Sequence, residues 1–425
     1  MRPSRTFLPP PAVSANMDER RRESGFRERT RIDDARERLR EVVSPVGRTE
    51  TVGVADADGR TLAETVAARR AVPGESRAAV DGFAVAASTT FGASDRSPAL
   101  LAADGDIGDG GGSRGARRVD AGDPLPSGAD AVVPVGGATR VDDTVEVFDP
   151  VAVCDGVAAV GSDVAADESL YEPGRQLRPP DLGLLRAAGV ESVTVRERPR
   201  VAVVPTGSDL VDDEPGPGES VETDSLTVAR LVERWGGVAD RYDAVADEIA
   251  AIGDALQEAA AAADVVATTG GSGLGESDRV PDALASAGSL FVHGIAATPG
   301  ESLGLGTVDD TPVVVLPGGP AACVVGAVQF LRPAVTWAEG REHEEPPTGP
   351  AMLARKVPSE PGVRTYVRVR FDAEGGQRVA VPLRTDGPLS HSSVGLADGW
   401  VEIREGIEGL PEGDLVAVQR WGWSP

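Results

Sequence analysis

The stretch that decides the fold is residues 262–284, AADVVATTGGSGLGESDRVPDAL. Val265–Ala267 form an apolar run typical of the end of a buried strand, and Thr268–Gly275 follow as a loop with four glycines and three hydroxyl side chains. Glycines let a backbone approach a ligand closely with its N–H groups turned inward. A helix that begins near Glu276 and Asp278 would add positive potential, which suits a phosphate. The spacing is neither the Walker loop nor the Rossmann fingerprint, so the stretch predicts a phosphorylated ligand without naming a protein class.

The composition indicates a multidomain globular protein with an acidic surface. The chain has 425 residues, 40 % of them hydrophobic, which is enough for about two to four domains. The formal net charge is −26, and Lys356 is the only lysine. Because the acidic residues are spread along the whole chain, we expect a hydrated surface like that of salt-adapted organisms, with an acidic interaction surface as the alternative. Such a surface opposes nucleic-acid binding.

Cysteine and histidine usage excludes the common metal and disulfide frameworks. Cys154 and Cys323 are the only cysteines, and the three histidines lie far apart in sequence. No apolar run of membrane-spanning length is evident, so no membrane association is expected. Residues 1–28 are rich in proline and arginine without the apolar segment of a secretion signal. We therefore expect a disordered tail at 1–28 and a cytoplasmic protein.

Strands and helices alternate between residues 198 and 340. Val201–Val204, Val265–Ala267 and Thr311–Leu316 read as short buried strands, and each is followed by a glycine-containing loop. This alternation predicts a mostly parallel sheet covered on both faces, with ligands at the carboxyl ends of the strands. The three loops are therefore expected to form one composite site. The helices expected here are Leu226–Trp235, Glu248–Ala261 and Ala321–Leu331.

The remaining segments predict smaller elements. A helix is expected at Asp33–Val43, and Val52–Glu64 reads as a strand, a turn and a second helix. A third helix is expected at Pro180–Ala188. Short alternating runs in Val80–Val153 predict a small β-domain, and those in Met352–Trp423 predict a β-barrel.

Six motifs follow one another in order along the chain. They are AVDGFAV at 79–85, AGDPLPSGADAVVPV at 121–135, RPRVAVVPTGSDL at 198–210 with Thr223-Asp224-Ser225 after it, TTGGSGLGESD at 268–278, ATPGESLGLG at 297–306 and LPGGPAACVVGAVQF at 316–330. Each is weak alone. Together they resemble the molybdopterin molybdenumtransferase family, which includes MoeA and the gephyrin E-domain, over about residues 30–423.

The resemblance implies a multidomain α/β plus β fold. A central three-layer α/β molybdopterin-binding domain with a mostly parallel sheet is expected at 198–340. An elongated linker and dimerisation domain is expected at 29–68 and 154–197, with a small β-domain inserted at 69–153. A C-terminal β-barrel domain is expected at 345–425.

The resemblance also implies a reaction. Molybdate or tungstate would be inserted into the dithiolene of adenylylated molybdopterin, with release of AMP, in the presence of Mg²⁺. A homodimer whose site is built from both subunits is expected. Molybdopterin adenylyltransferase and molybdoenzymes are the partners that such a protein would meet.

The resemblance implies that three carboxylates are catalytic residues, namely those of Asp81, Asp209 and Asp278. Asp209 and Asp278 are also the expected metal ligands. Two of the three carboxylates have a structural alternative, because Asp81 precedes Gly82 and suits a turn and Asp209 suits a cap. Glu276, close to Asp278, could be only a helix start that matches the helix dipole.

The expected cofactor-binding residues come from the three glycine loops and from a C-terminal loop. Asp224 could instead cap the next helix, and the prolines could simply end their strands. The two serines of the C-terminal loop could belong to a solvated turn. The residues are Thr206, Gly207, Asp224, Thr269, Gly270, Gly271, Ser272, Gly275, Pro299, Gly300, Pro317, Gly318, Pro320, Ser390 and Ser392.

Three departures from the family pattern bear on activity. Thr298 and Glu301 stand where the resemblance expects lysines, and Ala121 stands where it expects threonine. Replacing a cation by a carboxylate reverses the local charge, which opposes an anionic ligand. The competing hypothesis is therefore a non-catalytic or altered-specificity paralogue that binds molybdopterin or nucleotide and acts as carrier or regulator. A third reading, an adenylyltransferase or nucleotide-amide hydrolase built on the central domain alone, is disfavoured by the motif around Asp81 and by the C-terminal barrel.

Overall fold

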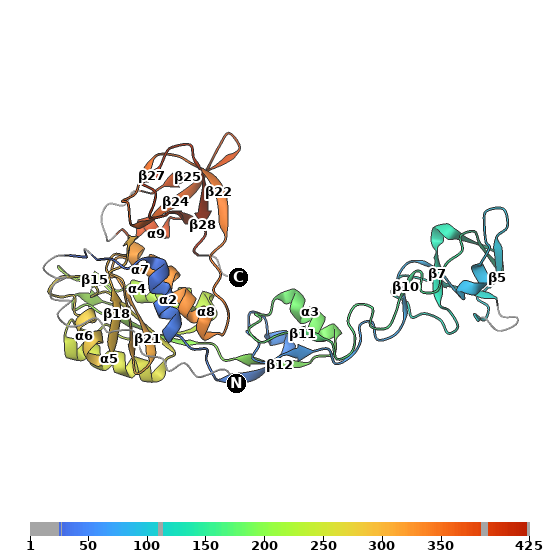
Figure 1. Cartoon of the computed structure of the whole chain (residues 1–425), viewed down its shortest axis with the longest axis horizontal. Coiled ribbons are helices and arrows are strands. Elements are labelled where there is room, and N and C mark those ends of the chain that lie inside the picture. The colour runs from blue at the N-terminus through green and yellow to red at the C-terminus, as the bar shows by residue number, and fades with distance from the viewer. Residues whose placement is uncertain (1–24, 27, 109–113, 384–389, 423–425) are drawn as a thin grey trace. The chain divides into compact units, whose positions relative to one another are not determined.

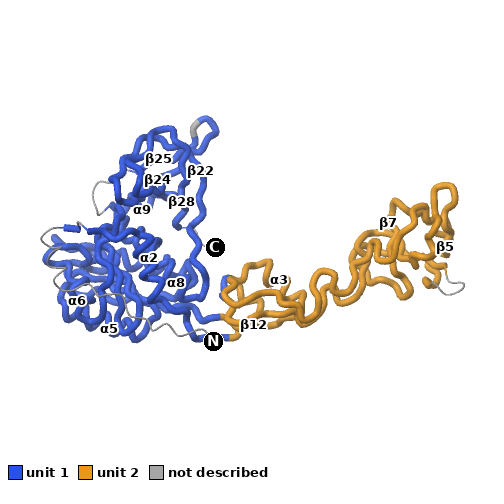
Figure 2. The backbone as a smooth tube through the Cα atoms, viewed as in Figure 1, with its two compact units in different colours: residues 1–50, 59–61, 196–425 blue, residues 51–58, 62–195 orange. Residues whose placement is uncertain are grey.

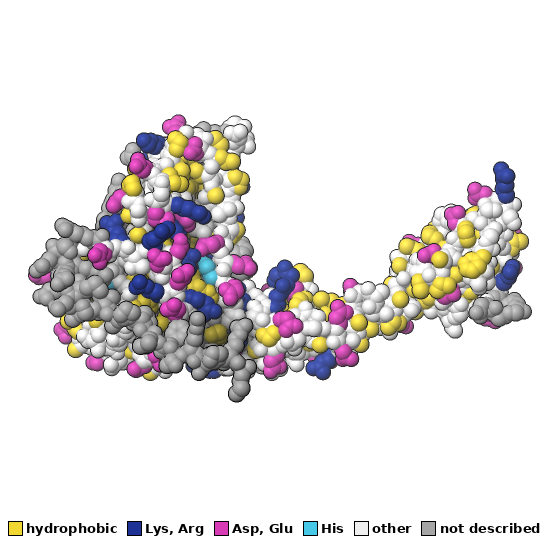
Figure 3. Space-filling model, in the orientation of Figure 1, with side chains coloured by type: hydrophobic (Ala, Val, Ile, Leu, Met, Phe, Trp, Pro, Cys, Tyr) yellow, Lys and Arg dark blue, Asp and Glu magenta, His cyan; other side chains and the backbone are white. Residues whose placement is uncertain are grey.

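The computed structural model describes residues 25–26, 28–108, 114–383 and 390–422, so most of the tail expected at 1–28 lies outside the described residues. The chain forms two compact units (Figure 2). Unit 1 comprises residues 1–50, 59–61 and 196–425, and unit 2 comprises residues 51–58 and 62–195. Acidic and basic side chains intermingle on the face drawn in Figure 3.

The core of unit 1 is a six-stranded sheet in which only β20 runs against the others, so the expected mostly parallel sheet is confirmed. Its inner strands carry runs of valine that are fully buried, and each buried valine contributes about 1.5–3 kcal/mol relative to an exposed one. The strand order is β16 (Val238–Arg241), β13 (Arg200–Pro205), β17 (Val265–Thr269), β21 (Thr311–Leu316), β20 (Gly304–Val308) and β18 (Ser289–His293).

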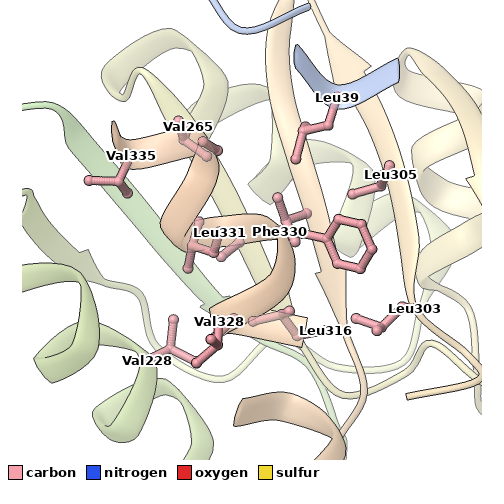
Figure 4. Packing of buried hydrophobic residues seen from close by; sticks show 14 of the residues in the cluster. Leu39, Val228, Val265, Leu303, Leu305, Leu316, Val328, Phe330, Leu331 and Val335 are labelled. Atoms are coloured by element: carbon pink, nitrogen blue, oxygen red, sulfur yellow. The ribbon is translucent and has the colours of Figure 1, made fainter. Parts of the chain in front are cut away.

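Helices cover both faces of this sheet (Figure 1). Because side chains alternate along a strand, Val203 and Val265 belong to one core cluster, whereas Val204 and Val266 belong to the other. Figure 4 shows the first of these clusters, in which Leu39 and Phe330 pack near strand residues. One face carries α5 (Ile249–Ala262) and α6 (Val280–Ala287). The other carries α2 (Ile32–Val42), α4 (Asp224–Arg234), α7 (Pro320–Gly326), the π-helix η4 (Ala327–Leu331) and α8 (Arg332–Ala338).

The last helical run is longer than the sequence predicts, because it continues to Ala338 rather than ending at Leu331. Pro333 lacks an N–H group, which leaves the carbonyl of Gln329 available, and the Nε of Arg36 donates to that carbonyl at 3.2 Å. The whole run Pro320–Ala338 is long and apolar enough to span a membrane, contrary to the expectation from sequence. However, 94 % of its apolar window is buried inside the protein, as in a core helix.

The C-terminal part of unit 1 is a closed five-stranded barrel, as expected. Closure comes from the pairing of β24 with both β25 and β26. The barrel strands are β22 (Thr348–Leu353), β24 (Arg364–Glu374), β25 (Gln377–Pro382), β26 (Gly399–Ile403) and β28 (Leu415–Gln419). The neighbouring short elements are β19 (Ala297–Thr298), which pairs with β24, β23 (Val357–Pro358), β27 (Gly409–Leu410) and α9 (Ser392–Gly395).

Unit 2 contains a six-stranded sheet of its own, curled into a half-barrel, which is the small β-domain that the sequence predicts. Its order is β7 (Ala131–Pro134), β4 (Gly82–Val85), β6 (Gly115–Val119), β5 (Ala99–Ala103), β9 (Thr144–Val147) and β8 (Ala138–Val141). Two-stranded ribbons join β2 (Val66–Ala67) to β11 (Ser169–Tyr171) and β3 (Arg77–Ala78) to β10 (Val157–Ala158). Another ribbon joins β1 (Thr49–Gly53) to β12 (Ser192–Arg196), and the helix α3 (Pro179–Ala187) matches its prediction within one residue.

The helix expected within Val52–Glu64 is absent from this described segment. A single 3₁₀ turn, η1 (Val54–Asp56), follows β1. The backbone N–H groups of Leu62 and Ala63 donate to the carbonyls of Arg175 and Thr194, so the chain is held in an extended course by distant partners. The other short elements are η2 (Ala87–Thr90), η3 (Val135–Gly137), β14 (Leu210–Val211) and β15 (Ser220–Val221).

Candidate functional site

Three loops leave the central sheet at one edge and surround a pocket of about 310 Å³, which we call the rim pocket. Pro205 pairs with Thr269, and Thr269 pairs with Leu316, so β13, β17 and β21 end at the same level. Gly207, Gly271 and Gly318, one from each following loop, all line this pocket. The shared register of parallel strands thus brings the three glycine loops together.

Two backbone positions of the middle loop require glycine. Gly270 has φ +88° and Gly271 has φ +57°, in the left-handed region. The N–H of Gly270 donates to the carbonyl of Leu316 at 3.1 Å, and the N–H of Thr206 donates to the carbonyl of Thr269 at 2.8 Å. These bonds tie each loop to its neighbour, so the pocket wall is a connected backbone surface.

The rim pocket is acidic. No lysine or arginine is among the described residues that line it, and His391 is the only basic side chain there. Several of the carboxylates already accept hydrogen bonds. Asp247 accepts from the N–H of Ser208 at 2.9 Å, and Asp278 accepts from the N–H of Gly275 at 2.8 Å. The lining carboxylates are those of Asp209, Glu222, Asp224, Asp247 and Asp278.

Asp224 has a strongly raised pKa. Burial, together with the nearby Glu222 carboxylate, raises the pKa of Asp224 to about 7. Glu222 is itself held by Arg241 at 3.1 Å and by the hydroxyl of Ser225 at 2.6 Å. Asp224 does not cap its helix with its side chain, because α4 begins at Asp224 itself. A half-buried carboxylate in this setting favours either a proton or a bound cation.

We expect Asp224→Asn to stabilise the protein at pH 8 and to leave its stability nearly unchanged at pH 4. A carboxyl whose pKa is raised on folding contributes stability below its unfolded pKa and loses that contribution as the pH rises through about 7. The asparagine removes this loss, and we expect a gain of about 1–3 kcal/mol at pH 8 after allowance for partial exposure. Urea unfolding followed by tryptophan fluorescence at both pH values measures it. A variant less stable than wild type at pH 8 would contradict this assignment.

A larger cleft of about 1180 Å³ adjoins the rim pocket. Gly271, Asp278 and Gly318 line both cavities. One wall of the cleft comes from the sheet-edge loops, and another comes from the barrel. Of the expected cofactor-binding residues, the cleft collects Gly271, Ser272, Pro299, Gly300, Pro317 and Gly318.

The barrel wall supplies cations that the sequence analysis missed. Arg355, Lys356 and Arg368 all line the cleft. Burial lowers the pKa of Arg368, whose Nε has no hydrogen-bond partner in the described part of the chain. Its Nη1 donates to the carbonyl of Tyr366 at 2.9 Å. The one signal that could have pointed here is Lys356, the only lysine of the chain.

The two residues that depart from the expected lysines also line the cleft. Thr298 and Glu301 lie on its sheet-edge wall. The Glu301 carboxylate forms an ion pair with Arg29 at 2.5 Å. On the same wall, the hydroxyls of Ser272 and Ser302 lie 3.0 Å apart. The negative charge of Glu301 is therefore partly compensated from outside its own loop.

Some expected site residues lie elsewhere. Ser390 and Ser392 are not among the described residues that line the rim pocket or the cleft, whereas His391 between them lines the rim pocket. Gly275 is not among the described residues that line either cavity, and its N–H donates to Asp278. Pro320 lines a third pocket of about 500 Å³, which Asp224 and His391 also line.

The helix expected to begin at Glu276 and Asp278 begins instead at Val280. The loop is longer than expected because the N–H of Val280 donates to the carbonyl of Gly271, and the Asp278 carboxylate accepts from the N–H of Gly275. The first turn of α6 therefore starts beyond the acids, and Asp278 closes the glycine loop instead of starting the helix.

Asp81 belongs to unit 2, in the turn before β4. It is exposed, and its Oδ1 accepts from the N–H of Ala121 at 2.7 Å. Ala121 is the position at which the resemblance expects threonine. The turn therefore presents a carboxylate beside a backbone amide.

The comparisons with known proteins agree with this architecture. Residues 30–189 match the "MoeA N-terminal region (domain I and II)", residues 202–337 the "Probable molybdopterin binding domain", and residues 350–421 the "MoeA C-terminal region (domain IV)".

Individual relatives match over nearly their whole length. The chain is 32 % identical to molybdopterin molybdenumtransferase 2 of Mycobacterium tuberculosis over 388 residues, which is 87 % of this chain and 93 % of the relative. It is 28 % identical to the molybdopterin molybdenumtransferase of Bacillus subtilis over 407 residues, 89 % of this chain and 93 % of the relative. The crystal structure of the MoeA protein from Pyrococcus horikoshii superposes with a TM-score of 0.77 at 27 % identity, covering 92 % of this chain and 100 % of that one. The chain therefore belongs to the MoeA family of molybdopterin molybdenumtransferases.

Proposed function

We propose that the protein inserts molybdate or tungstate into the dithiolene of adenylylated molybdopterin and releases AMP and the finished cofactor. One observation supports this reaction above the others. A basic cleft and an acidic rim pocket share the wall formed by Gly271, Asp278 and Gly318. A reaction between an oxyanion and a pterin that carries a pyrophosphate needs two such neighbouring environments.

The cleft suits the oxyanion. Arg355, Lys356 and Arg368 line it from the barrel. Arg368 is half-buried, and its buried Nε has no hydrogen-bond partner among the described residues. A desolvated guanidinium that lacks a carboxylate partner binds an anion more strongly than an exposed one does. We assign these three cations to the metal oxyanion.

The rim pocket suits a phosphate that arrives with a divalent cation. Its glycine loops expose backbone, and its five carboxylates would repel a bare phosphate. Among the described residues, no group of three or more His, Cys, Asp or Glu side chains could hold a metal ion by itself. Mg²⁺ commonly takes one or two carboxylates together with substrate phosphates, so Asp209 and Asp278 would be its protein ligands. The ion would neutralise phosphate charge beside the strongly perturbed Asp224.

The family resemblance supports a cytoplasmic homodimer in which Asp81 acts as a further catalytic carboxylate. Molybdopterin adenylyltransferase and molybdoenzymes are the proposed partners that deliver the substrate and accept the product. Light scattering of the purified protein tests the dimer.

The reaction itself is tested with purified protein, adenylylated molybdopterin, molybdate and Mg²⁺. We expect AMP release and a cofactor that activates a cofactor-free nitrate reductase. Failure of both readouts, in salt conditions that keep the protein folded, would refute the proposal. Binding of the pterin without AMP release would instead support the carrier or regulator, which Thr298, Glu301 and Ala121 favour.

We expect Arg368→Gln to raise the half-saturating molybdate concentration by about tenfold or more, because it removes a poorly solvated cation from the cleft. The matched control is Arg370→Gln, an exposed residue two positions along β24 that lies 3.8 Å from Asp372. The insertion assay at varied molybdate measures both variants. Equal effects of the two substitutions would contradict the role of Arg368.

A further inference from the structure

The segment just before α2 is fastened by backbone hydrogen bonds to residues 294–296, which directly precede the cleft-lining Ala297. The N–H of Thr30 donates to the carbonyl of Gly294 at 2.9 Å, and the N–H of Ala296 donates to the carbonyl of Thr30 at 2.8 Å. The Phe26 ring stands edge-on to His293, with 5.1 Å between ring centroids. The segment therefore has a defined course beside the loop that carries Glu301.

Arg29, within this segment, contacts a carboxylate of the cleft wall. Its Nη2 lies 2.5 Å from Glu301, and its Nη1 lies 3.5 Å from Glu360 of the barrel. Its Nε donates to the carbonyl of Phe26 at 3.1 Å, which orients the guanidinium. Arg29 thus contacts carboxylates from both the sheet-edge loops and the barrel.

The position of Glu301 in the cleft makes an ion-pair partner important for anion binding. Glu301 lines the same cleft as Arg355, Lys356 and Arg368. An uncompensated carboxylate there would repel the oxyanion that those cations attract. Pairing with Arg29 lowers this repulsion while leaving the cations of the barrel wall available.

We propose that Arg29 is a positioning residue that sets the oxyanion affinity of the cleft by neutralising Glu301. The inference rests on the proposed function for its choice of molybdate as ligand. It assigns to the segment before α2 a part in substrate selection, because the negative charge of Glu301 is compensated from another part of the chain.

The test compares single and double variants of the full-length protein, using molybdate binding by titration calorimetry and the insertion assay. We expect Arg29→Gln to weaken molybdate binding by about tenfold at low salt with kcat unchanged. Arg29→Lys, which keeps the charge, should stay near wild type. Because the pair is partly exposed, the loss should shrink at high salt.

The double variant distinguishes two possible roles of Arg29, which are to neutralise the charge of Glu301 or only to hold the segment before α2 in place. Arg29→Gln combined with Glu301→Gln should bind molybdate nearly as well as wild type, because no uncompensated carboxylate remains. If Arg29 only fastened the segment, the double variant would stay as weak as Arg29→Gln, and the proposal would be wrong. Arg31→Gln, which removes the same charge two residues away, is the matched control, and an equal loss there would also overturn the proposal.

The outcomes also separate this inference from the proposed function. A folded wild-type protein that neither binds molybdate nor releases AMP would refute both. A wild-type protein that does both, with Arg29→Gln indistinguishable from it, would refute the role of Arg29 alone.

Discussion

Asp81→Asn is expected to lower the turnover of metal insertion by at least about a hundredfold while leaving the fold intact, since loss of a catalytic acid–base group costs about 10²–10⁴ in rate. The asparagine oxygen can still accept the hydrogen bond that the N–H of Ala121 donates to Asp81 at 2.7 Å. The substitution therefore removes the charge and the proton-accepting capacity but keeps the turn. The measurement is AMP release at saturating molybdate and pterin.

The control for Asp81→Asn is Asp123→Asn in the same unit. Asp123 also closes a turn, because its Oδ2 accepts from the N–H of Asp120 at 2.9 Å. It has no expected catalytic role, so its variant should keep full turnover. Similar losses in both variants would indicate that the turns of unit 2 matter only for structure, and Asp81 would lose its assigned role.

The central sheet could be predicted because its strands are buried on both faces. A run such as Thr311–Leu316 has almost no polar side chain, and the structure places β21 at those residues. Once the strands are parallel, their carboxyl ends must meet at one edge. The gathering of Gly207, Gly271 and Gly318 around one pocket follows from that geometry alone.

The basic wall of the cleft could not be predicted in the same way. Arg355 and Lys356 lie just after β22, and Arg368 lies within β24, in a barrel of short strands. Their position in the same cleft as the glycine loops depends on how the barrel closes through β24 and on how it packs against the sheet-edge loops. Neither feature leaves a periodic pattern in the sequence.

Local helix propensity gives a wrong prediction where hydrogen bonds to distant residues determine the backbone conformation. Ala57–Glu64 contains alanine, leucine and glutamate, which favour a helix. The N–H groups of Leu62 and Ala63 are instead taken by the carbonyls of Arg175 and Thr194, far along the chain. After the glycine loop, α6 begins at Val280, later than predicted, because Asp278 accepts a hydrogen bond from the N–H of Gly275.

Gly270→Ala is expected to destabilise unit 1 by about 2–4 kcal/mol and to weaken binding of adenylylated molybdopterin. Gly270 has φ +88°, and a Cβ atom there would lie 2.4 Å from the backbone oxygen of Thr206. Neither the strained backbone nor the contact can relax cheaply, because Thr206 is itself bound through its N–H to the carbonyl of Thr269. Urea unfolding and pterin binding measure the two effects.

Gly253→Ala is the same glycine-to-alanine substitution, but it is expected to stabilise the protein. Gly253 lies within α5, and a Cβ atom there would meet nothing within 4 Å. Alanine in a helix interior should stabilise by about 0.5–1 kcal/mol, because it restricts the unfolded chain and favours the helix. A loss at Gly270 with a gain at Gly253 would show that the sheet-edge loop depends on its left-handed backbone. If Gly270→Ala were neutral, the loop would be more plastic than its contacts allow, and a backbone cradle for the pyrophosphate at this edge would be untenable.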